Sequence, residues 1–258
     1  MFASTRLRVP EVTIFFWTIK ALSTAMGEAT SDYMVHVMPP VLAVAIGFVG
    51  FVAAMVIQFT RRGYRAWSYW LAVVMVGVFG TMVADVLHVG FGVPYLVSAT
   101  LFAVVLALIF VSWYRVEHTL SIHSVNTARR EVFYWMTVVA TFALGTAVGD
   151  FTAVALGIGY LGSVLLFAVV IAIPAVAYAR FGMNSVLAFW FAYVLTRPLG
   201  ASVADWLGKT PAEGGLGAGN GLVALVLTVA IAVLVVYLGV TRRDVQPVPQ
   251  PEAISRTE

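Results

Sequence analysis

The chain has 258 residues, of which 61% are hydrophobic and only 10% are charged, and its formal net charge is +3. Together with a mean hydropathy of +0.96, this composition excludes an ordinary soluble domain and indicates an integral membrane protein, with the lipid bilayer as its main partner. Cysteine is absent, which excludes disulfides and thiolate metal sites, so a bound metal would need oxygen or imidazole ligands.

Eight segments are long and apolar enough to cross a bilayer, which takes about 20 residues. In chain order they are residues 12–33, 40–59, 66–88, 94–114, 131–152, 159–179, 185–207 and 221–241. The sequence therefore predicts an all-α membrane protein with eight transmembrane helices, in which residues 1–241 form a single transmembrane domain. The Pro-rich, polar tail of residues 242–258 is typical of a disordered segment.

Arginines gather near the N-terminus, in the tail, and in the connections that follow the even-numbered segments. The opposite connections contain Lys209 as their only Lys or Arg residue. The positive-inside rule then places both termini and the Arg-rich connections in the cytoplasm. This orientation explains the positive net charge without a nucleic-acid partner.

An internal repeat runs through the odd-numbered segments, where a tryptophan is followed by a glycine after ten residues and by an aspartate after fifteen. The simplest role of the tryptophans is anchoring at the membrane interface. The residues of this W-x9-G-x4-D pattern are Trp17, Trp70, Trp135 and Trp190, Gly27, Gly80, Gly145 and Gly200, and Asp32, Asp85, Asp150 and Asp205.

The repeating unit is a helical hairpin, and its four copies cover residues of about 12–59, 66–114, 131–179 and 185–241. Parallel repeats are related by an axis along the membrane normal, so the sequence predicts a pseudo-fourfold arrangement. The four aspartates would then meet at one depth around the axis. A single chain suffices for such a ring, and association into oligomers is left open.

Intramembrane aspartates indicate function, because a carboxylate near the centre of a spanning helix costs about 2.5–3.5 kcal/mol on insertion scales. Such acids usually face a bundle interior or a water-filled cavity. The alternative is that each aspartate merely ends its helix at the level of the outer headgroups. The glycine five residues earlier, which permits close packing or an interrupted helix, favours the functional interpretation.

Oxygen ligands also lie four residues before three of the aspartates, on the same helical face. These are Glu28, Thr81 and Thr146, while the fourth repeat has Ala201. Carboxylate and hydroxyl oxygens without thiolates suit hard cations such as Mg²⁺, Ca²⁺ or Mn²⁺. The predicted metal ligands are therefore Asp32, Asp85, Asp150, Asp205, Glu28, Thr81 and Thr146. His36 and His88 are either additional imidazole ligands or residues of the outer loops.

Two cations lie inside predicted spans. Lys20 is close enough to the interface for its amine to reach water. Arg197 lies near the middle of the bilayer, eight residues before Asp205, and Pro198 interrupts backbone hydrogen bonding beside it. We expect both cations to balance charge, with Arg197 paired to an aspartate. The alternative is that Arg197 competes with a transported ion or moves when a proton or a metal binds.

The segments "RVPEVTIFFWTIKALSTAMGEATSDY", "RVEHTLSIHSVNTARREVFYW" and "LTRPLGASVADW" resemble those of an uncharacterised family of bacterial membrane-anchored proteins. The resemblance covers nearly all of the chain except the tail. It implies a multi-pass protein of the bacterial inner membrane, and it brings no activity and no residue role.

These observations predict a secondary transporter of a hard, divalent, Mn²⁺-like cation, with proton coupling as an option. The alternatives are a passive cation channel, in which the aspartates concentrate ions, and a structural or sensory membrane protein that transports nothing. Catalytic motifs such as HExxH, GxSxG and the P-loop are absent. We therefore expect no enzyme and no cofactor, and a divalent metal only as cargo.

Overall fold

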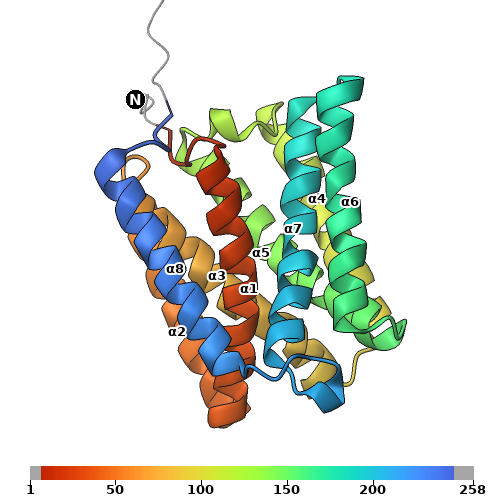
Figure 1. Cartoon of the computed structure of the whole chain (residues 1–258). Helices are drawn as coiled ribbons and strands as arrows, with labels where there is room; N and C mark the ends of the chain where they lie inside the picture. The colour runs from red at the N-terminus through yellow and green to blue at the C-terminus, as the bar shows by residue number, and fades with distance from the viewer. Residues whose placement is uncertain (1–6, 247–258) are drawn as a thin grey trace, which may run out of the picture.

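The computed structural model describes residues 7–246 and contains eight long helices in that range, which confirms the all-α prediction (Figure 1). Their bounds lie within a few residues of the predicted spans. In chain order the helices are α1 (Ile14–Val37), α2 (Pro40–Phe59), α3 (Ala66–Asp85), α4 (Tyr95–Glu117), α5 (Ala128–Asp150), α6 (Gly159–Phe181), α7 (Ser185–Gly208) and α8 (Asn220–Thr241).

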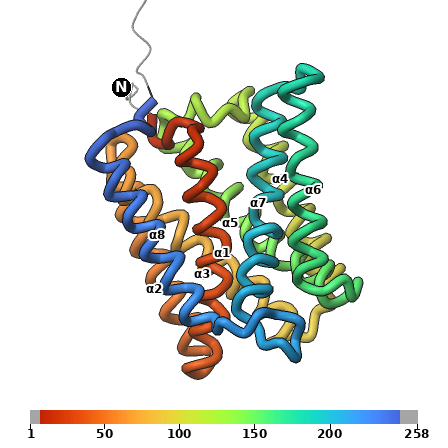
Figure 2. The backbone as a smooth tube through the Cα atoms, in the orientation of Figure 1, coloured from red at the N-terminus to blue at the C-terminus, as the bar shows by residue number. Residues whose placement is uncertain are grey.

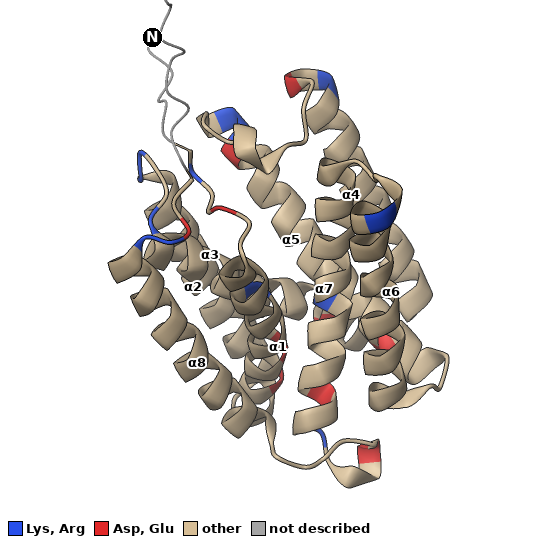
Figure 3. Ribbon diagram, turned by 45° about the horizontal axis from the view of Figure 1, so that its top comes forward, with Lys and Arg blue, Asp and Glu red and all other residues tan. Residues whose placement is uncertain are grey.

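Seven of these helices, α2 to α8, are long and apolar enough to cross a membrane. Helix α1 is the exception in the described range, and its sequence carries Lys20, Glu28 and Asp32 among the apolar residues. Apart from Lys20, Arg197 and Lys209, the Lys and Arg residues concentrate toward the end of the bundle that holds residues 7–13 and 242–246 (Figure 3). We call this end the arginine end, and the opposite end, near the repeated aspartates, the aspartate end.

The odd-numbered helices form the centre of the bundle. Helix α1 packs against α3, α3 against α5, α5 against α7, and α7 against α1, which closes a ring. The even-numbered helices lie outside, with α2 and α8 on one side and α4 and α6 on the other (Figures 1 and 2). Each outer helix packs mainly on the inner helix that follows it in the chain, and α8 packs on α1. Successive hairpins are therefore interlocked.

The repeated glycines lie where neighbouring inner helices touch. A Cβ atom at Gly27 would lie 2.7 Å from the backbone of Gly77 in α3, and one at Gly80 would lie 2.8 Å from Phe142 in α5. The same substitution at Gly145 would overlap Arg197 in α7, and at Gly200 it would overlap Thr24 in α1. The glycine of each repeat thus permits close packing of successive helices around the ring.

Two of the inner helices change their winding directly after the repeated aspartate. Helix α3 ends at Asp85 and α5 ends at Asp150, and each continues as one π-helical turn, η1 (Val86–Gly90) and η3 (Phe151–Ala155). Asp32 and Asp205, in contrast, lie inside continuous α-helix. Single π-helical turns often occur at functional sites because they reorient neighbouring groups.

Aromatic residues fill the arginine half of the bundle. Trp70, Trp135 and Trp190 are no more than 5% exposed and pack in the main hydrophobic core with Tyr69, Tyr134 and Tyr193, whereas Trp17 is only partly buried. Interfacial anchoring is therefore the wrong interpretation of these three tryptophans. Their rings pack against one another between helices, because the repeated position faces the ring interior.

The segment before α1 lies across the arginine end. The backbone N–H of Tyr64 donates a hydrogen bond of 2.9 Å to the carbonyl oxygen of Leu7 in this segment. The backbone N–H of Glu11 donates one of 2.8 Å to the carbonyl oxygen of Asp244. Gln246 Nε2 donates to Pro10 O over 2.9 Å, and both Asp244 and Gln246 are buried. Residues 242–246 are thus part of the fold, unlike the predicted disordered tail, whose remaining residues 247–258 lie outside the described range.

Candidate functional site

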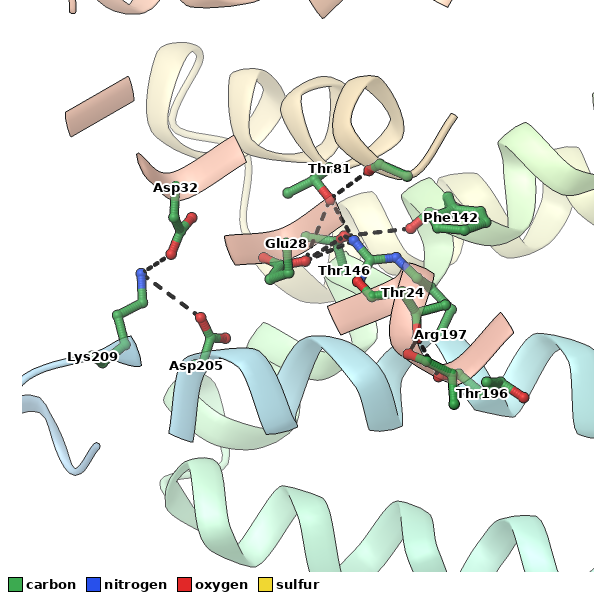
Figure 4. Close-up of polar contacts among 12 residues, drawn as sticks. Thr24, Glu28, Asp32, Thr81, Phe142, Thr146, Thr196, Arg197, Asp205 and Lys209 are labelled. Carbon is green, nitrogen blue, oxygen red and sulfur yellow. Dashed lines mark hydrogen bonds and ion pairs between the residues drawn. The ribbon is translucent and has the colours of Figure 1, made fainter. Parts of the chain in front are cut away.

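The centre of the ring holds a buried arginine among oxygen atoms. Arg197 is fully buried, and its Nη2 atom donates to Glu28 Oε2 over 2.6 Å and to Thr146 Oγ1 over 2.6 Å (Figure 4). The same nitrogen donates to Thr81 Oγ1, and Nη1 donates to the carbonyl of Thr24 over 3.2 Å. We call the side chains of Glu28, Thr81 and Thr146 with the Thr24 carbonyl the oxygen cage.

The cage is built by equivalent positions of the repeat. Glu28, Thr81 and Thr146 each lie eleven residues after the repeated tryptophan of their helix. Both hydroxyls also hydrogen-bond within their own helices, Thr81 to Gly77 O over 2.9 Å and Thr146 to Phe142 O over 3.4 Å. Their oxygen lone pairs are therefore turned toward the guanidinium, and the fourth helix supplies the cation instead of a ligand.

Local packing directs Arg197 into this position. Gly145 of α5 lies against the Cβ and Cγ atoms of Arg197, where any larger residue would overlap them. Phe142 lies on another side, with its ring centre 5.2 Å from the guanidinium carbon. The arginine stem is thus enclosed by α5 while its charged head reaches α1 and α3.

The ion pair differs from the one expected from the sequence. The sequence predicts an aspartate as the partner of Arg197, but Arg197 pairs with Glu28 of α1. Asp205 instead lies 3.8 Å from Lys209 Nζ, one helical turn further along. The reason is geometric, because Arg197 and Glu28 face the axis from neighbouring helices, and Asp205 lies nearer to the aspartate end.

The four repeated aspartates share one region on the aspartate side of the cage. The carboxylate of Asp85 interacts electrostatically with Glu28, Asp32 and Asp205. Asp150 interacts in the same way with Glu28, Asp85 and Asp32. Asp205 is buried, and the other three are partly buried. Within residues 7–246, however, no three Asp, Glu or His side chains are close enough together to hold a metal ion in this conformation.

Lys209 closes part of this acidic region, and sequence reasoning did not assign it to the site. Its Nζ atom donates to Asp32 Oδ2, and Asn220 Nδ2 donates to the same oxygen over 3.1 Å (Figure 4 shows Lys209 between Asp32 and Asp205). Burial opposes the charge, but Asp32 and Asp205 raise the pKa of Lys209 above its ordinary value. The available signal was its position as the only Lys or Arg in the connections that follow the odd-numbered helices.

Lys20 lies deeper than predicted. Its side chain is fully buried, so the amine does not reach water. The Nζ atom lies 4.0 Å from the ring centre of Phe142 and 4.1 Å from that of Tyr193. The prediction that this amine reaches water at the interface is therefore wrong, because Lys20 faces the ring interior and the neighbouring aromatic rings cover it.

The two histidines lie apart from the cage. His36 is exposed near the end of α1. His88 Nδ1 lies 2.8 Å from the Val93 carbonyl oxygen, and its ring stacks on Tyr95 with centres 3.5 Å apart. The structure thus places both histidines near the aspartate end of the bundle, and one ring nitrogen of His88 has a backbone partner.

A comparison with known protein families also finds four repeats in this chain. The family described as "Repeat of Unknown Function (DUF347)" matches residues 15–64, 68–119, 133–184 and 188–244. The chain belongs to this family. Each DUF347 repeat covers one inner helix and the outer helix after it. No curated protein and no solved structure matches the chain.

Proposed function

We propose that the protein is a secondary transporter of a hard cation, with Mn²⁺ as the representative cargo and protons as the coupling ion. The four DUF347 repeats would form parallel two-helix units around a pseudo-fourfold axis, with transport along that axis. Contacts between equivalent positions support this arrangement. The glycine of each repeat touches the next inner helix, and the last repeat returns to the first.

The oxygen cage is the observation that carries the proposal. A guanidinium cation is held at the centre of the bundle by one carboxylate and two hydroxyls. Oxygen ligands of this kind also suit hard metal cations. We infer that Arg197 acts as a tethered cation that fills the cage when no cargo is bound. A transported cation would displace the guanidinium from Glu28.

The acidic region would bring the cargo to the cage. Four aspartates on one side of the cage create a negative potential that raises the local concentration of cations. Lys209 offsets part of that potential through its contacts with Asp32 and Asp205. A complete metal site would form only after Arg197 moves, when an aspartate and Glu28 both become available as ligands.

The half of the bundle near the arginine end is closed along the axis, which favours a carrier over a continuously open channel. Three residues after the repeated tryptophans, the inner helices carry Lys20, Val73, Val138 and Tyr193, and all four are fully buried. Further side chains and the segment before α1 cover the arginine end. We assign the arginine end to the cytoplasm by the positive-inside rule, and the inner membrane of a bacterium as the location.

Uptake into proteoliposomes tests the function. The purified protein is reconstituted, and initial uptake of Mn²⁺, Mg²⁺ or Ca²⁺ is measured with and without an imposed pH gradient. Saturable uptake that responds to the gradient is expected, and Asp85→Asn should reduce it at least tenfold. Glu213→Gln is the matched control, because Glu213 is an exposed acid in the connection next to Lys209. Absence of flux for every cation, or equal flux in Asp85→Asn, would overturn the proposal.

A further inference from the structure

The amine of Lys20 occupies an unusual environment. The side chain is fully buried in the bundle, and Nζ has no hydrogen-bond acceptor among residues 7–246. It lies between the rings of Phe142, from α5, and Tyr193, from α7, at 4.0 and 4.1 Å from their centres. Cation binding by the oxygen cage and the repeated aspartates does not involve this amine.

The charges around Lys20 do not compensate an ammonium group. Arg197 of α7 is the charged residue near enough to act on it, and it has the same sign. Glu28, the acid two turns along α1, is already paired with Arg197. The other buried titratable side chains of the inner helices in this half of the bundle are Tyr69, Tyr134, Tyr193 and Glu131, and Glu131 is already paired with Arg8. Helix α2 has no titratable side chain, and α8 has Tyr237, which contacts Phe15.

Both protonation states of Lys20 are nevertheless accessible. An unpaired ammonium group is expensive to bury, which favours the neutral amine in this conformation. The faces of two aromatic rings, however, attract a cation and reduce the cost of the charged form. A change at Arg197 or Glu28 can therefore decide whether the amine holds a proton.

Several tyrosines lie between Lys20 and the arginine end. Tyr193 contacts the amine, and the rings of Tyr193 and Tyr134 both pack on Trp190. Tyr134 and Tyr69 share a hydrogen bond between their hydroxyls. The ring of Tyr69 lies 5.6 Å from that of Tyr64, which donates to Asp244. The Tyr193 hydroxyl has no hydrogen-bond partner among residues 7–246, so these tyrosines do not form a continuous hydrogen-bonded path to the amine in this conformation.

We propose that Lys20 is a proton-exchange site, neutral while Arg197 or a cargo cation occupies the oxygen cage and protonated in the step in which the one has left the cage and the other has not yet entered it. The lone pair of Nζ takes up one proton to form the ammonium ion and releases that proton when a cation occupies the cage again. Repulsion between the ammonium ion and a cargo cation in the cage makes the two alternate. Only this coupling role rests on the proposed transport function.

The protonation state is tested without transport by the pH dependence of unfolding in mixed detergent micelles. If folded Lys20 is neutral, the unfolded chain binds one more proton, and the folding constant of the wild type rises tenfold per pH unit relative to Lys20→Met between about pH 7 and pH 9. Lys209→Met is the matched control, because the acid partners of Lys209 keep it charged and predict no such slope. Parallel pH profiles for wild type and Lys20→Met would overturn the proposal.

The coupling role is tested in proteoliposomes that contain a pH-sensitive dye. Lys20→Met should move at least tenfold fewer protons per Mn²⁺ ion than the wild type, and a wild-type ratio would overturn the coupling role. If the wild type transports no cation at all, the proposed function fails, while the unfolding experiment still decides the protonation of Lys20.

Discussion

Arg197 of α7 and Glu28 of α1 form a fully enclosed ion pair, in which Nη2 and Oε2 lie 2.6 Å apart. The two residues are 169 positions apart in the chain. They join the first repeat to the last at the centre of the bundle, so the same contact both closes the ring and fills the oxygen cage.

Removing one partner of this pair should destabilise the protein. Glu28→Gln leaves a buried guanidinium without its counter-charge, and we expect a loss of about 3–5 kcal/mol in the free energy of unfolding. Replacing both residues, as in Glu28→Gln with Arg197→Met, should recover much of this loss because no buried charge remains. A double-mutant cycle in mixed micelles measures the coupling, and additive effects of the two substitutions would contradict the pairing.

The repeated glycines should not tolerate a side chain. Gly27→Ala places a methyl group 2.7 Å from the backbone of Gly77, and because backbone cannot move aside like a flexible side chain, we expect a loss of about 1–3 kcal/mol. Gly239→Ala in α8 is the control, since nothing lies within 4 Å of the added atom. It should be neutral or stabilising by up to about 1 kcal/mol. Equal unfolding free energies for the two variants would refute the close helix contact.

Asp244 should make stability depend on pH. Burial raises the pKa of Asp244 above its ordinary value of 3.8, although the hydrogen bond from Tyr64 acts in the opposite direction. Because the folded-state pKa is the higher one, this contribution to stability is complete below the unfolded value and is lost as the pH rises through the folded value. The wild type should therefore lose stability relative to Asp244→Asn above pH 3.8. Thermal unfolding in nanodiscs over this range measures the difference, and identical profiles would exclude the effect.

Lys209 should weaken cation binding at the aspartate end. Lys209→Gln removes a positive charge that contacts Asp32 and lies 3.8 Å from Asp205. If the proposed transport is correct, the apparent KM for Mn²⁺ should fall roughly three- to tenfold, and added salt should reduce the difference between the variants. Initial uptake rates at two ionic strengths measure both effects. A KM that stays the same or rises would contradict this role of Lys209.

Much of the fold follows from local sequence properties. Apolar length predicts the spans, and the spacing of Trp, Gly and Asp predicts which faces of the inner helices share an environment. Helix α2 packs more on α3 than on α1, although both are its neighbours in the chain, and the sequence does not distinguish their similar apolar surfaces. Helix spacing alone therefore indicates the repeat but not the interlocked arrangement of its copies.

The site was predictable in part. Position in the repeat identified Glu28, Thr81 and Thr146 as neighbours, and they are neighbours through Arg197. The predicted partner of Arg197, an aspartate, is wrong because the guanidinium lies at the level of Glu28, one helical turn before the repeated aspartate of α1. The predicted depth of Lys20 is wrong because it depends on interfacial tryptophans, and three of the four repeated tryptophans are buried.

Binding of Mn²⁺ to the purified protein in nanodiscs tests the central claim most directly, and electron paramagnetic resonance of the free ion reports it. If Arg197 is a tethered cation in the site, the wild type should show one saturable site. Arg197→Gln should bind about tenfold more tightly, because a competitor worth about 1.4 kcal/mol is gone, and Glu28→Gln should not bind. Absence of binding in both the wild type and Arg197→Gln, or equal binding in all three proteins, would contradict the account.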